Sequence, residues 1–329
     1  MHVLLSNEGS YREVVQYMKS KGAQTKVIGP GSVANGFVLP GKLAIIASMF
    51  SPRLLKLKSS WSGSDRVVII GWQAFSVLAL IKMGVLPRPA KTVVVGLFVH
   101  SPRLRKIVNL FIRLVRFPGL SFITGSESES SELINNARVP AENVYYQLWR
   151  EDLDGRVAER DIVEGDYVFS GGYSNRDYDL LLRSMKGLDA PLVIVASAKN
   201  TIADHDPARV QIHRDIEESE FERLLAQSRI VVLALKSQGD GCGQSVLLRV
   251  FRNGKPLIMT RHASVVDYVG DDYPGFVPLD DEGAMETAIS RALHDETYRN
   301  KLAAEVRRAQ ARLEQKGNSG QEVMQFLMA

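Results

Sequence analysis

The sequence predicts an α/β protein with two Rossmann-like domains, each organised around a parallel sheet. The chain has 329 residues, which is long enough for two domains that each have a core. It opens with the pattern of a strand, a helix and a strand, at Val3–Ser6, Tyr11–Lys21 and Thr25–Ile28. Apolar runs of the kind that form buried parallel strands recur in both halves, as at Arg66–Gly71 and Ile230–Leu235.

Further strands and helices alternate along the first half. Ala74–Met83 has the pattern of a helix that ends at Gly84, and Thr92–Val99 and Leu120–Thr124 have the pattern of strands. A helix is expected over Ser126–Asn135, because Ser126 and Glu129 have the spacing of a capping box. The first half ends with the strand pattern Val144–Trp149, and we place its domain at residues 1–150.

The second domain is expected over residues 151–316, beginning with the polar linker Glu151–Glu164. Its strands are predicted at Tyr167–Ser170, Leu192–Ser197 and Val210–Ile212, before Ile230–Leu235. A long helical pattern of mixed charge follows at Ala284–Lys316, and residues 317–329 contain a last helix, Gln321–Met328.

The composition is that of an ordinary soluble globular protein, with 45% hydrophobic and 24% charged residues. A single cysteine excludes an internal disulfide and favours a reducing compartment. No apolar stretch is long enough to span a bilayer, and the N-terminus lacks a signal-peptide pattern. A cytoplasmic protein is therefore expected.

The charges of the two halves have opposite signs. Residues 1–126 hold 17 Lys and Arg against three acids, whereas the remainder holds 24 basic and 34 acidic residues. So basic a first domain predicts a polyanionic partner or an anionic membrane surface. Nucleic acid is disfavoured, because the basic segment has few aromatic residues for base stacking and no recognised binding motif.

The segment Arg103–Arg116 has the pattern of an amphipathic basic helix without acids. Such a helix is typical of proteins that lie on anionic lipid, and the alternative is a core helix with a solvated basic face. We expect Leu104, Ile107, Val108, Phe111, Leu114 and Val115 to share its apolar face, and Arg103, Arg105, Lys106, Arg113 and Arg116 to contact the membrane.

A glycine-rich turn follows the strand Ile230–Leu235 and precedes a helix expected at Val246–Phe251, with Ser245 as a candidate cap. Glycines and the free N–H groups of a helix N-terminus together favour phosphate, although a simple tight turn has the same pattern. Cys242 in this turn is either a reactive thiol or a small residue that fills it. The candidate phosphate-binding residues are Asp240, Gly241, Cys242, Gly243, Gln244 and Ser245.

Three motifs follow the turn in order: Gly254-Lys255-Pro256-Leu257-Ile258, Asp267-Tyr268-Val269 and Gly275-Phe276-Val277-Pro278. With the glycine turn, this series resembles the C-terminal half of family 4 glycosyltransferases of the GT-B fold, over roughly residues 168–308. The resemblance implies a nucleoside-diphosphate-sugar donor bound between two domains, transfer with retention of configuration, and no metal or other cofactor. It also implies that the last helix packs back on the first domain.

The resemblance assigns His100 and Arg176 to the site, and positions at the carboxyl ends of strands add Glu8 and Lys199. His100, at the end of the strand Thr92–Val99, is similar to a family histidine near the transferred sugar. Glu8, after the first strand, is a candidate contact for the acceptor, with a helix cap at Ser10 as the alternative. Arg176 falls on a family lysine that contacts the donor diphosphate, and Lys199 is a candidate contact for phosphate or base.

The sequence departs from the family at the ribose-binding glutamate, where it has Arg249. An arginine cannot accept hydrogen bonds from ribose hydroxyls, so Arg249 is expected to contact the diphosphate or to pair with an acid. Asp240 lies one residue out of register with the family's other glutamate.

The resulting hypothesis is a glycosyltransferase that moves a sugar to a lipid-linked saccharide acceptor in exopolysaccharide or glycolipid assembly on the inner face of the plasma membrane. Two alternatives remain open at this point. One is a non-catalytic subunit of a polysaccharide assembly complex, which the presence of Arg249 supports. The other is a different sugar-nucleotide enzyme on the same fold, such as an epimerase or a pyruvyl transferase.

Overall fold

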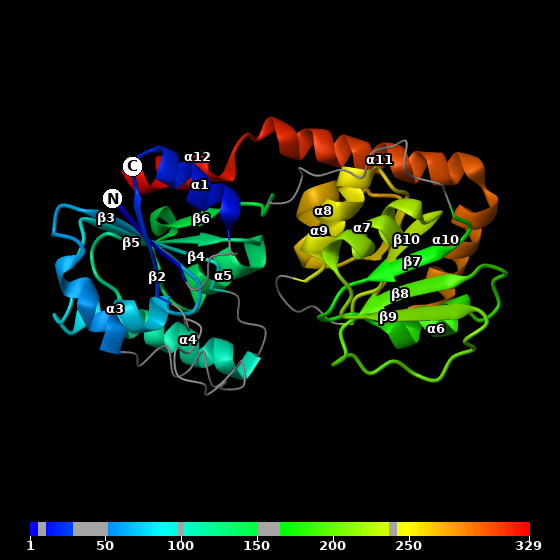
Figure 1. Ribbon diagram of the computed structural model, residues 1–329, viewed down its shortest axis with the longest axis horizontal. Coiled ribbons are helices and arrows are strands. Elements are labelled where there is room, and N and C mark those ends of the chain that lie inside the picture. Colours follow the sequence, from blue (N-terminus) through cyan, green and yellow to red (C-terminus); the bar gives the residue numbers. More distant parts are fainter. Residues whose placement is uncertain (6–10, 29–51, 98–101, 151–164, 237–241) are drawn as a thin grey trace. The chain divides into compact units, whose positions relative to one another are not determined.

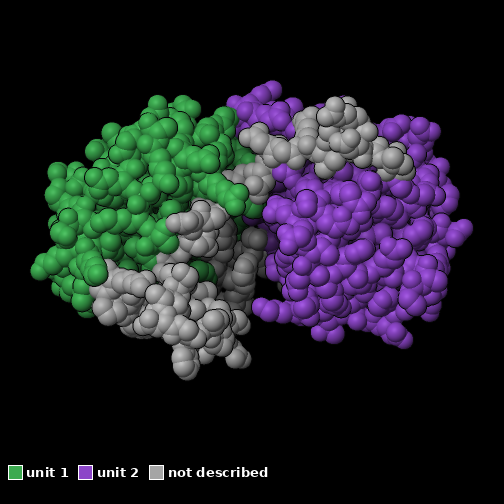
Figure 2. Space-filling view, in the orientation of Figure 1, with its two compact units in different colours: residues 1–151, 317–329 green, residues 152–316 purple. Residues whose placement is uncertain are grey.

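The computed structural model describes the chain except for residues 6–10, 29–51, 98–101, 151–164 and 237–241. The chain divides into two compact units, which Figure 2 colours separately. Unit 1 comprises Met1–Glu151 and Gly317–Ala329, and unit 2 comprises Asp152–Lys316.

Unit 1 is a parallel sheet with helices on both faces (Figure 1). Its strands have the order β2-β1-β3-β4-β5-β6. The elements are β1 (His2–Leu5), α1 (Arg12–Ser20), β2 (Gln24–Val27), the 3-10 helix η1 (Pro52–Ser59), β3 (Arg66–Ile70), α3 (Ala74–Lys82), β4 (Lys91–Val95), α4 (Pro102–Val115), β5 (Leu120–Thr124), α5 (Glu127–Asn135), the 3-10 helix η2 (Ala141–Asn143), β6 (Val144–Tyr146) and α12 (Ser319–Met328).

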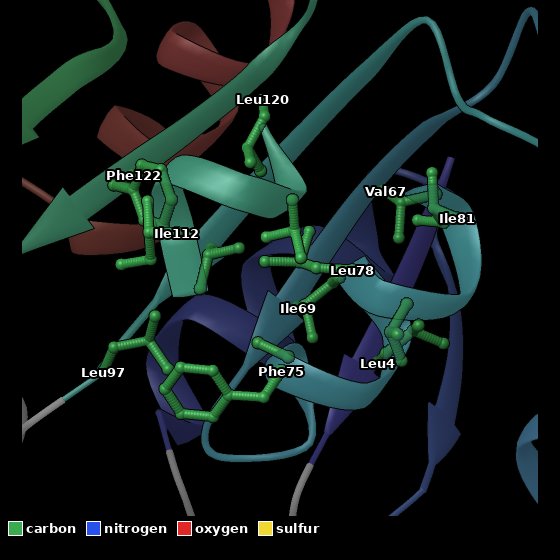
Figure 3. Packing of buried hydrophobic residues seen from close by; sticks show 14 of the residues in the cluster. Leu4, Val67, Ile69, Phe75, Leu78, Ile81, Leu97, Ile112, Leu120 and Phe122 are labelled. Carbon is green, nitrogen blue, oxygen red and sulfur yellow. The ribbon is translucent and has the colours of Figure 1, made fainter. Parts of the chain in front are cut away.

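Alternate residues along the strands enter two separate hydrophobic cores, because successive side chains of a strand point to opposite faces. Val67 and Ile69 of β3 pack in one cluster with α3 and α4, which Figure 3 shows from close by. Val68 and Ile70 pack in the other cluster with α1 and α12. Both faces of this sheet are therefore buried, which explains why its strands appear in the sequence as continuous apolar runs.

The C-terminal helix α12 belongs to unit 1, where it packs against α1. Val323 and Leu327 are fully buried there. Polar contacts hold the start of the helix to the end of β6: the Gln147 side chain donates to Ser319 O at 3.0 Å and Arg150 pairs with Glu322 at 2.9 Å.

Unit 2 is a second parallel sheet, with the order β12-β11-β10-β7-β8-β9. Helices α7 and α8 pack against each other, as do α6 and α10. The elements are β7 (Val168–Gly171), α6 (Tyr178–Met185), β8 (Leu192–Ala196), β9 (Val210–Arg214), α7 (Glu218–Gln227), β10 (Ile230–Leu233), α8 (Gln244–Asn253), β11 (Leu257–Thr260), α9 (Ala263–Val269), β12 (Phe276–Val277), α10 (Glu282–His294) and α11 (Glu296–Gln315).

Both sheets have the strand order of a doubly wound fold, so the predicted pair of Rossmann-like domains is confirmed. In such a sheet the order of the strands reverses at one switch point, and ligands bind outside the carboxyl ends of the two strands that flank it. In unit 2 these strands are β7 and β10, which pair in parallel with Ile230 opposite Val168.

Local signals in the sequence give several helix ends correctly. The Ser126 side chain accepts the Glu129 N–H at 3.1 Å and so caps α5 as predicted. The helical stretch expected over Ala284–Lys316 consists of two helices, α10 and α11. The break lies at Asp295, whose side chain accepts the Tyr298 N–H and starts α11.

The packing of α12 gives a stability prediction. Replacing Leu327 with alanine leaves a cavity against α1, so we expect the free energy of unfolding of unit 1 to fall by about 2–5 kcal/mol. Urea denaturation followed by far-ultraviolet circular dichroism measures this loss. Met328→Ala is the matched control, because Met328 is exposed and its truncation is expected to change stability by less than about 0.5 kcal/mol. Equal effects of the two substitutions would contradict the docking of α12.

Candidate functional site

The candidate site of unit 2 consists of the segments that follow β7 and β10 at the switch point. An antiparallel bridge joins Arg176 to Leu235, and the backbone N–H of Asp177 donates to Ala234 O at 3.0 Å. The two segments thus form one connected surface at the end of the sheet. Its polar residues come from the β7–α6 loop, the start of α8 and the start of α9.

Arg176 is the buried cation of this surface, with 5% of the residue exposed. Its guanidinium donates to Gly171 O at 2.9 Å and Ser174 O at 2.7 Å. Gly172 lies so close that a Cβ there would clash with the guanidinium, and its φ of +127° also requires glycine. Burial lowers the pKa of Arg176, but an arginine remains protonated at neutral pH. The loop is therefore built around a fixed positive charge.

The helix α8 begins at the glycine turn. Its N-cap is Gly243, with φ +88°, and within the described residues no side chain caps this helix. The prediction that Ser245 is the cap is wrong: Ser245 lies inside the first turn of α8, with its side chain exposed. The left-handed backbone of Gly243 lets the helix begin two residues earlier, so the positive end of its dipole lies at Gly243–Ser245.

Cys242 and Gln244 face the interior, toward the start of α9. The Cys242 sulfur lies 3.5 Å from His262 Nε2 and accepts a hydrogen bond from Asn175 Nδ2 at 3.1 Å. Gln244 Nε2 donates to Ser264 O at 3.5 Å. Burial raises the pKa of the Cys242 thiol, but hydrogen bonds from His262, Asn175 and Ser264 and the charge of His262 outweigh it, and the pKa is lowered overall.

His262, Asn175 and Ser264 are site residues that the sequence analysis missed. His262 follows β11 at its carboxyl end, the same kind of position that made His100 a candidate, and this was the available signal. Asn175 has a positive φ of 55°, which asparagine tolerates better than most residues. Neither Asn175 nor Ser264 belongs to a sequence motif, because their role arises only when the three segments meet.

Arg249 faces α7. Its guanidinium lies 2.8 Å from Glu218 and 3.2 Å from Glu222, and it stacks over the ring of Phe221 at 4.8 Å. The acid pairing, one of the two roles expected for Arg249, is thus present, and it joins α7 to α8. Glu222 also pairs with the buried Arg252, so one carboxylate serves two arginines.

The remaining predicted site residues are either exposed or outside the described part of the chain. Lys199 is exposed in the turn after β8, where its backbone N–H donates to Ser197 Oγ at 3.2 Å. Glu8, His100, Asp240 and Gly241 lie outside the described residues, and their roles remain predictions.

The helix α4 of unit 1 has two apolar rows rather than the single apolar face predicted. Val108, Ile112 and Val115 are buried against the core. A second row is exposed to solvent, with Leu104 at 40%, Ile107 at 64%, Leu110 at 56% and Leu114 at 65%. The predicted apolar face combined residues of the buried row and the exposed row, because a rotation of 100° per residue places these two rows side by side on the helix. Lys106 and Arg113 are exposed and Arg105 is half-buried, whereas Arg116 bonds to Arg138 O. The Arg103 side chain is outside the described part.

In the described part of the chain, no helix combines the length and the apolar character needed to cross a bilayer.

Comparisons with known proteins identify the fold. No protein-family model matches the sequence, and no curated protein matches it. Solved structures do match over the whole chain. Anabaena HepE, in complex with UDP and glucose, has a TM-score of 0.71 at 13% identity and covers 100% of this chain and 99% of its own. An E. coli trehalose-6-phosphate structure bound with UDP-2-fluoro glucose has 0.70 at 9% identity, with 100% and 99% covered.

A UDP-forming α,α-trehalose-phosphate synthase from Burkholderia vietnamiensis has a TM-score of 0.67 at 13% identity and covers 100% of both chains. These are GT-B structures, so the chain has the two-domain α/β GT-B fold that the sequence predicts. The family 4 membership suggested by the resemblance is not supported by any family model.

The contacts of Arg249 generate a prediction that separates structure from ligand binding. Replacing Arg249 with methionine removes the ion pairs to α7, so the free energy of unfolding of unit 2 should fall by about 1.5–3 kcal/mol. Chemical denaturation measures this loss. Nucleotide affinity, measured by calorimetry, should stay unchanged, since the guanidinium faces α7. A large loss of affinity at unchanged stability would instead give Arg249 a role in donor binding.

Proposed function

We propose that the protein is a glycosyltransferase that binds a nucleoside-diphosphate-sugar at the switch point of unit 2. The observation that carries this proposal is the arrangement of Arg176 and the N-terminus of α8, which follow the two strands that flank the switch point. Ligands of doubly wound sheets bind at this position. The GT-B fold supports the same conclusion, because matching structures of that fold contain UDP or a UDP-sugar.

The chemistry asked of these groups is electrostatic. A diphosphate leaving group gains negative charge as the sugar departs, and fixed positive charge in the site stabilises it. The N–H groups at the start of α8 and the buried charge of Arg176 provide this positive charge. Lys199 adds an exposed cation in the turn after β8, the strand next to β7. In keeping with the family resemblance, we propose retention of configuration without a metal.

The acceptor is proposed to be a saccharide, carried on a lipid in exopolysaccharide or glycolipid assembly. His100 and Glu8 are the proposed catalytic and acceptor-side residues, on the basis of their positions after predicted strands. One observation still favours the alternative of a non-catalytic subunit: the chain has Arg249 at the position where the family has a ribose-binding glutamate. Slow hydrolysis of a bound sugar nucleotide would distinguish the enzyme from a subunit that only scaffolds.

A charge change at the start of α8 tests donor binding. Ser245 is exposed in the first helical turn, where an acid stabilises the helix but repels a diphosphate. We expect Ser245→Glu to weaken binding of the preferred nucleotide among UDP, GDP and ADP by at least about tenfold, because like charges near a protein surface repel by about 4 kcal/mol at ~4 Å. Isothermal titration calorimetry measures the affinity.

Ser245→Gln is the matched control, with the same length and no charge, and its affinity should stay near that of the wild type. Binding of none of the three nucleotides to the wild-type protein would refute the proposed function. Equal losses in both variants would show that bulk, rather than charge, matters at this position.

We also propose that unit 1 docks on the inner face of the plasma membrane through α4. The exposed row Leu104, Ile107, Leu110 and Leu114 provides apolar area for the acyl boundary, and Lys106 and Arg113 provide charge that complements anionic headgroups. An apolar row open to water beside basic side chains is costly in an aqueous environment but suits an interfacial helix.

Vesicle flotation tests the docking surface. We expect the wild-type protein to float with vesicles that contain phosphatidylglycerol and to be released as salt rises, because salt screens surface charge. Ile107→Ser with Leu114→Ser should weaken binding by about tenfold or more, given roughly 1.5–3 kcal/mol for each buried aliphatic side chain.

Met328→Ser on α12 is the control, because Met328 is also exposed but α12 packs on the opposite face of the sheet from α4. Binding to neutral vesicles alone, or unchanged binding of the double variant, would contradict this surface.

A further inference from the structure

Helices α4 and α5 enclose a polar hollow on the surface of unit 1. Its volume is 420 Å³, which is within the range of pockets that hold small ligands. Helix α4 lines it with the basic side chains of Arg105, Lys106 and Arg113, and α5 lines it with Glu132 and Asn136. The basic side of α4 is therefore one wall of a concave site, and it differs in this from a flat solvated helix face.

A buried hydrogen bond forms the base of the hollow and joins the two helices. Asn109 of α4, with 7% of the residue exposed, donates from Nδ2 to Glu132 Oε1 at 2.5 Å. The second carboxylate oxygen of Glu132 accepts a hydrogen bond from Asn136 Nδ2 at 2.8 Å. The carboxylate is thus held in place, and since each of its oxygens has two acceptor positions, it can also accept hydrogen bonds from hydroxyl groups of a ligand.

The cations of the hollow are spaced along one side of α4. Arg105 and Arg113 stand four residues before and after Asn109, and residues at this spacing are neighbours on a helix surface. Three basic side chains and one acid line the hollow, which is a net charge of +2. Within the described residues, neither Lys106 nor Arg113 forms an ion pair. This wall favours an anion, and the donor fork of an arginine suits a phosphate group.

The hollow is continuous with the exposed apolar row of α4. Leu110 lines the hollow and is also a member of that row, with 56% of the residue exposed. A ligand that uses both features has an anionic, hydrogen-bonding part in the hollow and an apolar part along the row. A phospholipid has this arrangement, whereas a soluble phosphate or a nucleic acid would leave the apolar row in water.

We propose that the hollow between α4 and α5 binds the headgroup of a phospholipid whose phosphodiester carries free hydroxyl groups, as in phosphatidylglycerol. Lys106 and Arg113 contact the phosphate, Glu132 accepts hydrogen bonds from the hydroxyl groups, and the acyl chains lie along the exposed row. The inference rests on the proposed docking of unit 1. It adds a choice among anionic lipids, which general surface charge does not make, because such charge attracts headgroups of equal charge alike.

Flotation with two lipids of equal charge tests this choice. Phosphatidylcholine vesicles receive an equal fraction of either phosphatidylglycerol or phosphatidylmethanol, which has the same phosphodiester charge but no headgroup hydroxyl. We expect the wild-type protein to partition about threefold to tenfold more strongly onto the phosphatidylglycerol vesicles, because hydrogen bonds from the hydroxyl groups to Glu132 form only there.

A substitution at Glu132 separates recognition from charge. Glu132→Gln removes a negative charge, so general attraction to both kinds of anionic vesicle should rise, but an amide is a weaker acceptor and the preference for phosphatidylglycerol should fall toward one. Glu127→Gln is the matched control, since it makes the same charge change in the first turn of α5 and outside the hollow. Its preference should equal that of the wild type.

A soluble headgroup distinguishes a lipid site from a general phosphate site without vesicles. Glycerophosphoglycerol, the deacylated headgroup, and inorganic phosphate are each titrated into the ¹⁵N-labelled full-length protein. We expect glycerophosphoglycerol to shift the side-chain amide signals of Asn109 and Asn136, and phosphate at equal concentration to shift them much less. Equal shifts with the two probes would overturn the assignment of the hollow to a headgroup.

Equal partitioning of the wild-type protein onto the two kinds of vesicle would overturn the inference and leave the docking surface of α4 intact. An equal loss of preference in Glu132→Gln and Glu127→Gln would also overturn it, because charge alone would then account for the effect. Absence of flotation with either lipid would instead refute the docking of unit 1, and the glycerophosphoglycerol titration would still decide whether the hollow binds the headgroup.

Discussion

The pairing of β7 with β10 is the constraint on which the candidate site depends. These strands are far apart in the sequence, and their parallel pairing brings the loop that holds Arg176 against the segment that leads into α8. The bridge between Arg176 and Leu235 closes the contact. A cation from one segment and a helix N-terminus from the other then act on the same region, which is the property that an anion site requires.

Burial determines how this site can work. Arg176 cannot reach out as a surface arginine does, because its guanidinium is already hydrogen-bonded to two carbonyl groups of its own loop. Its contribution is a permanent charge inside a low-dielectric environment, where electrostatic effects are stronger than in water.

The fold was predictable because both sheets are buried on both faces, which leaves continuous apolar runs such as Ile230–Leu233 in the sequence. The glycine turn was predictable for a similar reason, since positive φ at Gly243 requires a glycine. The start of α8 was misplaced because a glycine N-cap leaves no side-chain signal. The partners of Cys242 were missed because Asn175 and His262 come from different loops, and only the tertiary structure brings them together.

In the proposed complex, a nucleoside diphosphate binds at the start of α8 beside Arg176. The most direct measurement is the chemical-shift change of backbone amides in the ¹⁵N-labelled full-length protein when UDP, GDP or ADP is added. We expect the largest changes at Gly243, Gln244 and Ser245 and in the loop that contains Arg176. Changes confined to other parts of the chain, or none with any of the three nucleotides, would contradict it.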